Sequence, residues 1–225
     1  MKLYHDPAST TSRIVSFFLF DNDIPFDEAI VTTAAGEQHH PELKILNPNG
    51  HVPVLVDDNG FTLTESAAII RYLAWKHQLG VYPANLEART RVDEAMSWFQ
   101  TNFHVYHCAM LAYTYILPAL RSLEPGVLAT IRHMGQQGSQ RYLQVLNDHM
   151  IGSNPYVCGA RITLADYVGA ANVTLGHFAG VDLAPYPNVV RWLDTLAVRK
   201  GWAPAYAAFE AALAASPAGP RRHAA

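Results

Sequence analysis

The chain has 225 residues and a formal net charge of −3; half of its residues are hydrophobic and 16% are charged. This composition is typical of a globular protein, and without a Lys/Arg-rich run it gives no electrostatic reason to expect binding to nucleic acid. No apolar run reaches the roughly 18 residues that span a bilayer, and the N-terminus lacks the pattern of a signal peptide, so no association with a membrane is expected. The two cysteines, Cys108 and Cys158, form no disulfide framework, which indicates a reducing, cytoplasmic location.

Short strands alternate with helices over residues 1–78. In chain order the patterns predict a strand at 2–5, a helix at 13–22, a strand at 25–33, a short helix at 41–46, a hairpin over 52–64 and a helix over 65–77. The hairpin is indicated by Asn59-Gly60, a strong turn signal between two strand-like runs. This order predicts an α/β domain in which helices cover the faces of a small mixed sheet.

A Gly/Pro/Asn linker at 79–85 separates this domain from an all-helical domain over 86–225, where the two-residue period of strands disappears. Helices are predicted at 86–115, 126–150, 163–177, 188–199 and 201–214. The first of these exceeds the ordinary length of a globular helix, so we expect a kink or a break in it. The tail over 215–225 is expected to fray.

The first feature with chemical meaning is Val52-Pro53, at the entry to a strand. Proline lacks an N–H donor and is tolerated in sheets at edges, strand starts or bulges. A cis peptide bond at Pro53 would explain the position and would leave the N–H and C=O of Val52 free to pair with a peptide-like ligand. The alternative is that Pro53 only begins an edge strand.

Two further clusters lie at predicted helix starts. At Thr64-Glu65-Ser66, the helix N-terminus attracts carboxylates and Glu65 could pair with an ammonium group, which together suits an amino-acid head group. The alternative is that Thr64 is a simple N-cap and Glu65 a favourable first-turn acid. In the run from Ser9 to Arg13, a hydroxyl could donate a hydrogen bond to a thiolate, although plain helix capping also explains it.

Taken in this order, these features resemble the cytosolic glutathione transferase superfamily. The segments that carry the resemblance are NPNGHVPVL, FTLTESAAIIRYL, VYPANLEARTRVDEAMSW and ITLADY, the last with the spacing of a capping box at Thr163 and Asp166. It extends from Leu3 to about Phe209. The resemblance implies a thioredoxin-like first domain, a cis Pro53, pairing of Val52 with the cysteinyl backbone of glutathione, and contacts from Glu65 and Ser66 to its γ-glutamyl end.

The N-terminal segment LYHDPASTTSR resembles the theta-type members, in which a serine after the first strand stabilises the thiolate. On that alignment the serine is Ser9, with Ser12 and Thr10 as alternatives because neighbouring hydroxyls leave the register open. Theta-like members hold the glycine carboxylate before the second helix, which implicates Gln38, His39 and His40, and His51 would add to that end; the alternative is that the histidine pair lies in a solvated loop. No cysteine precedes position 108, so cysteine-dependent exchange at this site is not expected.

The long helix is expected to supply the second, hydrophobic substrate site. Trp98 with His107 nine residues on resembles bacterial beta-class members, in which that histidine lies near the sulfur. If one helix face points inward, the pocket is lined by Phe103, Tyr106, His107, Met110 and Tyr113; the alternative is that aromatic residues at this spacing form core. His104-x-x-His107-Cys108 lacks a further ligand in view, so no metal is predicted.

The predicted function is conjugation of glutathione to a small hydrophobic electrophile by a homodimeric enzyme, with glutathione as co-substrate and no permanently bound cofactor. A non-catalytic glutathione-binding or regulatory module of the same fold is the alternative from another class, because fold alone does not establish activity. A glutathione-dependent dehalogenase would use the same site and differ in the electrophile.

Overall fold

The structure is a computed structural model that describes residues 1–216. By its contacts the chain divides into two units: the first comprises Met1–Leu79 and Val198–Ala211, and the second comprises Gly80–Ala197 with the stretch that begins at Ala212. The first is built on a mixed sheet and the second is helical, which confirms the predicted fold class. The expected fraying of the tail falls largely on residues 217–225, which lie outside the described residues. Within residues 1–216, no helix is long and apolar enough to cross a bilayer.

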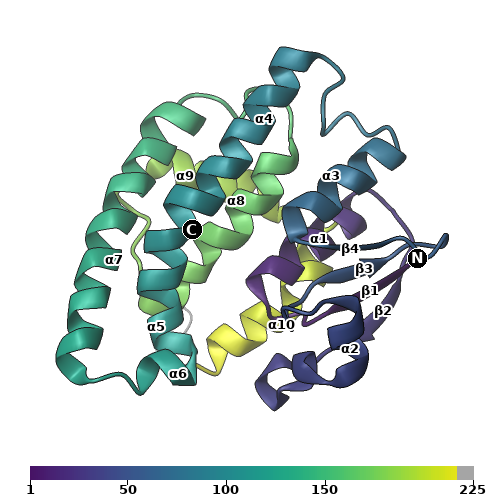
Figure 1. Ribbon diagram of the computed structural model, residues 1–225. Coiled ribbons are helices and arrows are strands. Elements are labelled where there is room, and N and C mark those ends of the chain that lie inside the picture. The colour runs from purple at the N-terminus through teal and green to yellow at the C-terminus, as the bar shows by residue number, and fades with distance from the viewer. Residues whose placement is uncertain (217–225) are drawn as a thin grey trace. The chain divides into compact units, whose positions relative to one another are not determined.

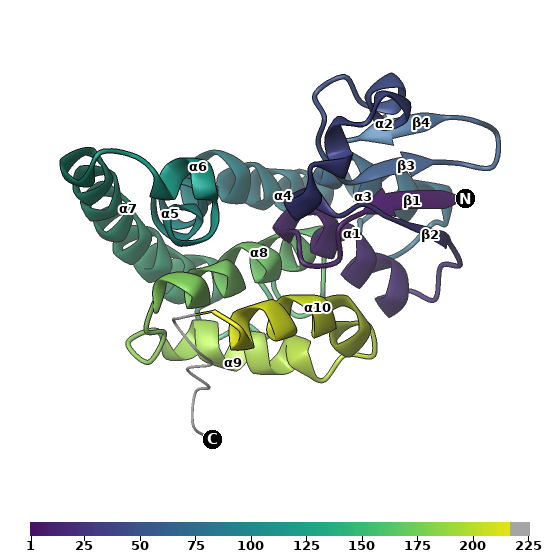
Figure 2. The same cartoon turned by 90° about the horizontal axis from the view of Figure 1, so that it is seen from below.

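The sheet of the first unit has four strands in the order β2-β1-β3-β4 (Figure 2). The strands are β1 (Lys2–His5), β2 (Asp27–Ile30), β3 (Val54–Val56) and β4 (Thr62–Thr64). β1 pairs with β2 in parallel, while β3 runs antiparallel to both β1 and β4, so the predicted hairpin is confirmed. The second strand is shorter than predicted because the chain turns into the 3-10 helix η1 (Thr33–Ala35) after Val31.

Four α-helices among the described residues belong wholly or mainly to this unit: α1 (Thr10–Asp21), α2 (Pro41–Leu46), α3 (Ser66–Lys76) and α10 (Trp202–Ala214). The sequence pattern groups α10 with the helical domain, yet its first ten residues pack in the first unit. Trp202 places its ring edge-on to Phe17, with centroids 5.6 Å apart, and Arg199 forms an ion pair with Asp21 at 2.7 Å. Tertiary contacts with α1 therefore decide where this segment belongs.

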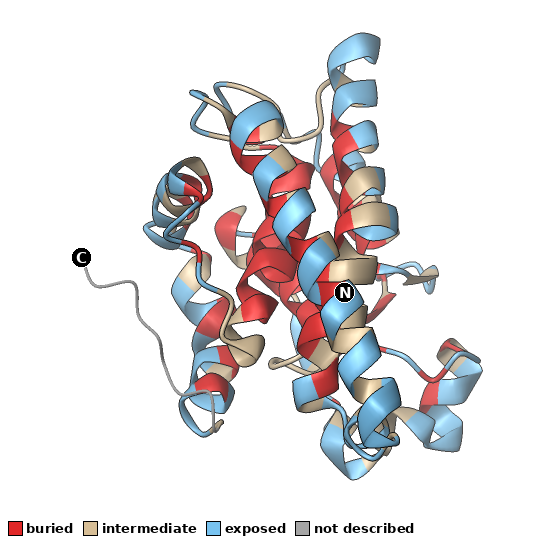
Figure 3. Cartoon of the chain, turned by 90° about the vertical axis from the view of Figure 1, so that its left-hand side faces the viewer, coloured by how far each residue is buried: buried red, intermediate tan, exposed pale blue. Residues whose placement is uncertain are grey.

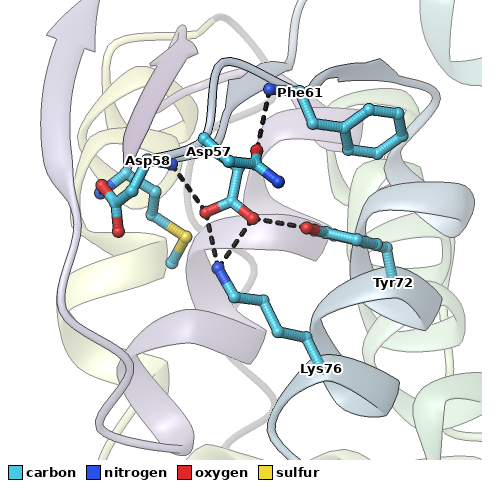
Figure 4. A network of polar contacts seen from close by, with 7 residues as sticks. Asp57, Asp58, Phe61, Tyr72 and Lys76 are labelled. Carbon is cyan, nitrogen blue, oxygen red and sulfur yellow. Dashed lines mark hydrogen bonds and ion pairs between the residues drawn. The ribbon is translucent and has the colours of Figure 1, made fainter.

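A buried carboxylate ties the β3–β4 hairpin to α3 (Figure 4). Asp57 accepts hydrogen bonds from the Lys76 ammonium at 2.6 and 2.7 Å, from the Tyr72 hydroxyl and from the backbone N–H of Asp58. Burial opposes ionisation of Asp57, but the hydrogen bonds from Lys76, Tyr72 and Asp58 outweigh it and lower its pKa from 3.8 to about 2. The network fixes the hairpin against the helix that begins at Ser66.

In the helical unit, the predicted long helix runs from α4 (Leu86–Trp98) through the π-helical segment η3 (Phe99–Ala112) to α5 (Tyr113–Ile116) (Figure 1), and its winding changes along its length. The segment η3 packs closely on α7 (Pro125–Val145) because two glycines face it. A Cβ at Gly135 would lie 2.7 Å from the carbonyl carbon of Met110, and one at Gly138 would lie 2.2 Å from the Tyr106 ring.

The helix α8 (Leu164–Leu175) is buried along its whole length, and buried residues are red in Figure 3. The predicted capping box at its start is confirmed: Asp166 accepts from the Thr163 N–H at 2.7 Å, and its other oxygen accepts from the Trp192 ring N–H at 2.9 Å. The remaining elements of this unit are α6 (Pro118–Arg121), η4 (Leu146–Ile151), η5 (Gly176–Ala179) and α9 (Pro187–Ala197). Of these, α6 was not predicted.

Candidate functional site

One edge of the sheet gathers the polar segments that the sequence singles out in the first unit. Tyr4 on β1 is paired with Val54 on β3, and Val54 is paired with Thr64 on β4. Because of this register, the segment after β1, the segment before β3 and the segment after β4 all emerge at the same edge. These segments carry Ser9, Val52-Pro53 and Glu65-Ser66 respectively.

The Val52–Pro53 peptide bond is cis, as predicted. The carbonyl of Val52 accepts a hydrogen bond from the Thr11 hydroxyl at 2.9 Å. One residue earlier, the carbonyl of His51 accepts from the Asn47 side-chain amide at 2.8 Å. A carbonyl oxygen has two lone pairs, so Val52 retains acceptor capacity for a ligand amide.

Glu65 has an unusual backbone conformation, with φ +65° and ψ 110°. A non-glycine residue in a sparsely populated region costs about 1–3 kcal/mol, and such residues cluster at functional sites. Thr64 lies within β4, so the alternative in which Thr64 caps the helix does not hold: Glu65 occupies the N-cap position, and its carbonyl accepts from Ile69 N–H at 2.9 Å. Ser66 begins α3 and is 6% exposed. Helix geometry leaves the first N–H groups of α3 without an intrahelical acceptor, which suits a carboxylate.

The structure separates the candidate hydroxyls at the start of α1 by their access to solvent. Ser9 is the N-cap residue of α1 and is half-buried. Ser12 is fully buried, and its oxygen accepts from the backbone N–H of Asp6 at 3.3 Å. Thr10 is 4% exposed. Among these three predicted candidates, Ser9 is the hydroxyl that a ligand thiol can approach.

Sequence reasoning missed Thr11, which connects Ser9 to Val52. The Ser9 and Thr11 hydroxyl oxygens lie 3.2 Å apart, and Thr11 also contacts the Val52 carbonyl. A carbonyl cannot donate, so the one hydroxyl proton of Thr11 goes to Val52 and the Ser9 hydroxyl is the donor to Thr11. No signal in the sequence distinguishes Thr11 from its neighbouring hydroxyls, because the contact with Val52 spans 41 residues.

Two short turns of 3-10 helix precede α2, and the second carries Gln38 and His39. The chain passes from η1 through Gly36, at φ +81°, into η2 (Glu37–His39). A Cβ at Gly50 would lie 2.8 Å from His39 Nδ1, so the His39 ring covers Gly50, two residues before Val52. Gln38 Oε1 is buried and has no hydrogen-bond partner among the described residues. His40, the N-cap of α2, and His51 are exposed.

The structure corrects the predicted lining of the hydrophobic pocket at Phe103 and His107, which are both fully buried in the helical unit. His107 Nδ1 lies 2.7 Å from the Ser139 hydroxyl, and its Nε2 lies 3.1 Å from the Val173 carbonyl. Burial lowers the pKa of His107 to about 4, so the ring is neutral near pH 7. These aromatic residues form core, because their helix face is covered by neighbouring helices rather than by a cavity.

The other three predicted pocket residues are half-buried and face different neighbours. Tyr106 packs over Gly138 and has its ring centroid 5.6 Å from that of Tyr142. The Tyr113 ring lies 5.8 Å from the ring of His104, whose Nδ1 is 2.8 Å from the Asn172 side-chain oxygen. Met110 contacts Gly135 through its backbone. Both ring nitrogens of His107 and the Nδ1 of His104 therefore lie within hydrogen-bond distance of protein groups.

The helical unit contains a cavity of about 510 Å³ that none of these five residues lines. Its wall is formed by α4, the end of α7, η4 and the following loop, and includes Trp98, Met150 and Cys158. Burial raises the pKa of the Cys158 thiol to about 11, so this sulfur is protonated near neutral pH.

Comparison with known proteins agrees with the architecture. Residues 8–75 match the profile described as "Glutathione S-transferase, N-terminal domain", and residues 132–200 match "Glutathione S-transferase, C-terminal domain". The theta-1 glutathione S-transferase of Mus musculus is 34% identical over 207 residues, which cover 89% of this chain and 84% of that protein. The theta-1 glutathione S-transferase of Homo sapiens is 32% identical over 200 residues, which cover 85% of this chain and 80% of that protein.

Solved structures give the same result. The apo form of human glutathione S-transferase T1-1 superimposes with a TM-score of 0.80 at 29% identity, covering 97% of this chain and 93% of that one. Human theta-2, solved in complex with glutathione and an unknown ligand, gives a TM-score of 0.81 at 25% identity, covering 98% and 93%. A thioredoxin-like first domain followed by a helical domain therefore defines the class of protein. The chain belongs to the glutathione S-transferase family and is a theta-like member of it.

Proposed function

We propose that this protein is a glutathione transferase that joins the glutathione sulfur to an electrophilic carbon of an apolar substrate. The observation that supports this most directly is the sheet edge itself. It places a solvent-accessible serine, the backbone edge before a cis proline and an acidic residue at a helix start around one location in the first unit. The theta-class relatives, which carry the name glutathione S-transferase, support the same activity.

Glutathione is proposed to bind along this edge as an added strand. Its cysteinyl backbone pairs with Val52, and its α-carboxylate lies at the N-terminus of α3 beside Ser66. The γ-glutamyl ammonium group pairs with Glu65. The glycine carboxylate lies toward the segment after η1, where Gln38 and His39 are the nearest candidates and His40 and His51 lie further along the chain.

The proposed mechanism uses the thiolate of glutathione as the nucleophile. Ser9 donates a hydrogen bond to the sulfur, which favours loss of the thiol proton to solvent; the hydrogen bond to a charged acceptor is stronger than one to a neutral thiol. The thiolate electron pair forms a carbon–sulfur bond. The electrophile either loses its leaving group with the bonding pair or, if it is an activated alkene, takes up a proton from solvent. Binding both reactants in one orientation supplies a large share of the rate gain.

The assembly is proposed to be a homodimer. Trp75 on α3 is 62% exposed and Leu86 at the start of α4 is 75% exposed, which supports the involvement of these helices in a subunit interface. Neither Cys108 nor Cys158 forms a disulfide bond among the described residues, which supports the proposed cytoplasmic location.

The decisive experiment is ultraviolet difference spectroscopy of glutathione thiolate as the protein is titrated near neutral pH. We expect a thiolate band with the wild type that weakens or moves to higher pH in Ser9→Ala. Ser97→Ala, an exposed serine on α4, is the matched control and should leave the band unchanged.

Four other results have distinct meanings. An equal band in the wild type and Ser9→Ala would transfer the role to another hydroxyl. Glutathione binding without a band in the wild type would favour the non-catalytic binding module. Release of halide from haloalkanes, with no reaction of other electrophiles, would identify a dehalogenase. Absence of any glutathione binding would overturn the proposed function.

A further inference from the structure

Asp6, the residue that follows β1, contacts two loops that are far apart in the sequence. Its side-chain Oδ1 accepts from the backbone N–H of Ala8 at 2.9 Å, and its carbonyl accepts from the N–H of Ser9 at 3.0 Å. Its own N–H donates to the Ser12 hydroxyl at 3.3 Å. Asp6 therefore determines the course of the chain that presents the Ser9 side chain.

The other carboxylate oxygen of Asp6 holds a different segment. Oδ2 accepts from the backbone N–H of Thr33 at 3.1 Å and also from the Thr33 hydroxyl. Thr33 is the first residue of η1, and three residues later Gly36 carries the chain into the turn that bears Gln38 and His39. The carboxylate thus bridges the serine segment to the segment that covers Gly50.

Local chain geometry explains one half of this arrangement but not the other. An aspartate that accepts from an N–H two residues on is an ordinary Asx turn and needs no further role. The contacts to Thr33 reach across 27 residues and place both donors of that residue on one carboxylate oxygen. Hydrogen bonds to an ionised acceptor are stronger than neutral ones, so the bridge resists relative movement of the two segments.

We propose that Asp6 is a positioning residue for glutathione. It fixes the spacing between the Ser9 hydroxyl and the Gln38–His39 segment, so that the thiol and the glycine carboxylate of one ligand are bound at the same time. This inference rests on the proposed function. Its physical basis is preorganisation: a site held at the correct spacing loses less conformational freedom when the ligand binds.

The test compares two ligands, glutathione and γ-glutamylcysteine, which lacks the glycine. Dissociation constants are measured by titration calorimetry for the wild type, Asp6→Ala and Asp6→Asn, with Asp27→Asn on the exposed start of β2 as the matched control. We expect the wild-type preference for glutathione over γ-glutamylcysteine to fall about tenfold in Asp6→Ala. Asp6→Asn, which keeps one carbonyl acceptor, should give an intermediate loss, and Asp27→Asn should keep the full preference.

A milder pair of variants covers the case in which Asp6→Ala does not fold. Thr33→Val removes the hydroxyl donor and keeps the backbone donor, so we expect the preference to fall about threefold. Thr33→Ser restores the hydroxyl and should restore the preference.

Loss of affinity for both ligands by the same factor in Asp6→Ala and Thr33→Val would assign Asp6 a purely structural role and overturn the inference. An unchanged preference in every variant would overturn it as well. If the wild type binds neither ligand, the proposed function itself fails, and the inference fails with it.

Discussion

Thr11→Val tests how the Ser9 hydroxyl is prepared for catalysis. The substitution keeps a β-branched side chain and removes the hydroxyl that lies between Ser9 and the Val52 carbonyl. In the present geometry the Ser9 proton points to Thr11, so a bound thiol must displace Thr11 as the acceptor. Without the Thr11 hydroxyl, Ser9 is free to donate to the sulfur.

The expected magnitude follows from the hydrogen bond that Ser9 gives up. A neutral intramolecular hydrogen bond contributes about 1 kcal/mol net, and one pKa unit corresponds to about 1.4 kcal/mol. The pKa of the bound glutathione thiol should therefore fall by about 0.7 in Thr11→Val. The Val52 carbonyl also loses the hydrogen bond from the Thr11 hydroxyl that fixes its position, which contributes about 1 kcal/mol. We therefore expect KM for glutathione to rise about fivefold.

The assay is a pH titration of thiolate absorbance at saturating glutathione, accompanied by steady-state kinetics. Thr101→Val is the matched control, because the Thr101 hydroxyl also donates to a backbone carbonyl, that of Ser97 at 2.9 Å, but lies on η3 in the helical unit. Thr11→Ser should behave like the wild type. A higher pKa of the bound glutathione thiol in Thr11→Val than in the wild type would refute the reasoning. It would mean that the Thr11 hydroxyl assists the Ser9 hydroxyl instead of competing with the sulfur for its proton.

Two further predictions concern stability and its dependence on pH. Asp57→Asn should lose about 1–2 kcal/mol of unfolding free energy in urea at pH 7, after allowance for the solvent-exposed Lys76 partner. The folded-state pKa of Asp57 is lowered from 3.8 to about 2, so this contribution is present above pH 3.8. The unfolding free energies of the variant and the wild type should converge as the pH falls through about 2. For His107 the folded-state pKa is lowered from 6.5 to about 4, so between these pH values the unfolded chain binds a proton that the folded chain does not. The free energy of unfolding of the wild type should therefore fall by about 3 kcal/mol as the pH is lowered from 6.5 to 4. His107→Gln should remove that part of the acid dependence, and an identical slope in both proteins would contradict the assignment.

Much of the fold could be predicted because its signals are local. The Asn59-Gly60 turn, the proline at the start of α2 and the Thr163–Asp166 capping box each act over a few residues, and all three lie where the sequence predicts. The cis bond before Pro53 was also predicted, although through the family resemblance rather than through the turn chemistry alone.

The candidate site was predicted only in part. Glu65 and Ser66 lie at a helix start as expected, but the conformation of Glu65 depends on how β4 turns into α3. Within the run of four hydroxyls, the choice of Ser9 rested on the family resemblance, since the exposure of each hydroxyl depends on how α1 packs. Burial removes Ser12, which leaves Ser9 accessible.

The sequence by itself determined the order of the main strands and helices, the two domain classes and the segments that can carry a peptide-like ligand, because periodicity, capping and turn chemistry are properties of short stretches. Tertiary structure alone decided which side chains meet. The contacts of Asp6 with Thr33 and of Thr11 with Val52 span 27 and 41 residues. Likewise His107 was expected at a pocket, yet it lies in the core, since its partners Ser139 and Val173 come from helices 32 and 66 residues away. Which face of a helix is covered depends on the elements that pack against it, and that information is not contained in the helix itself.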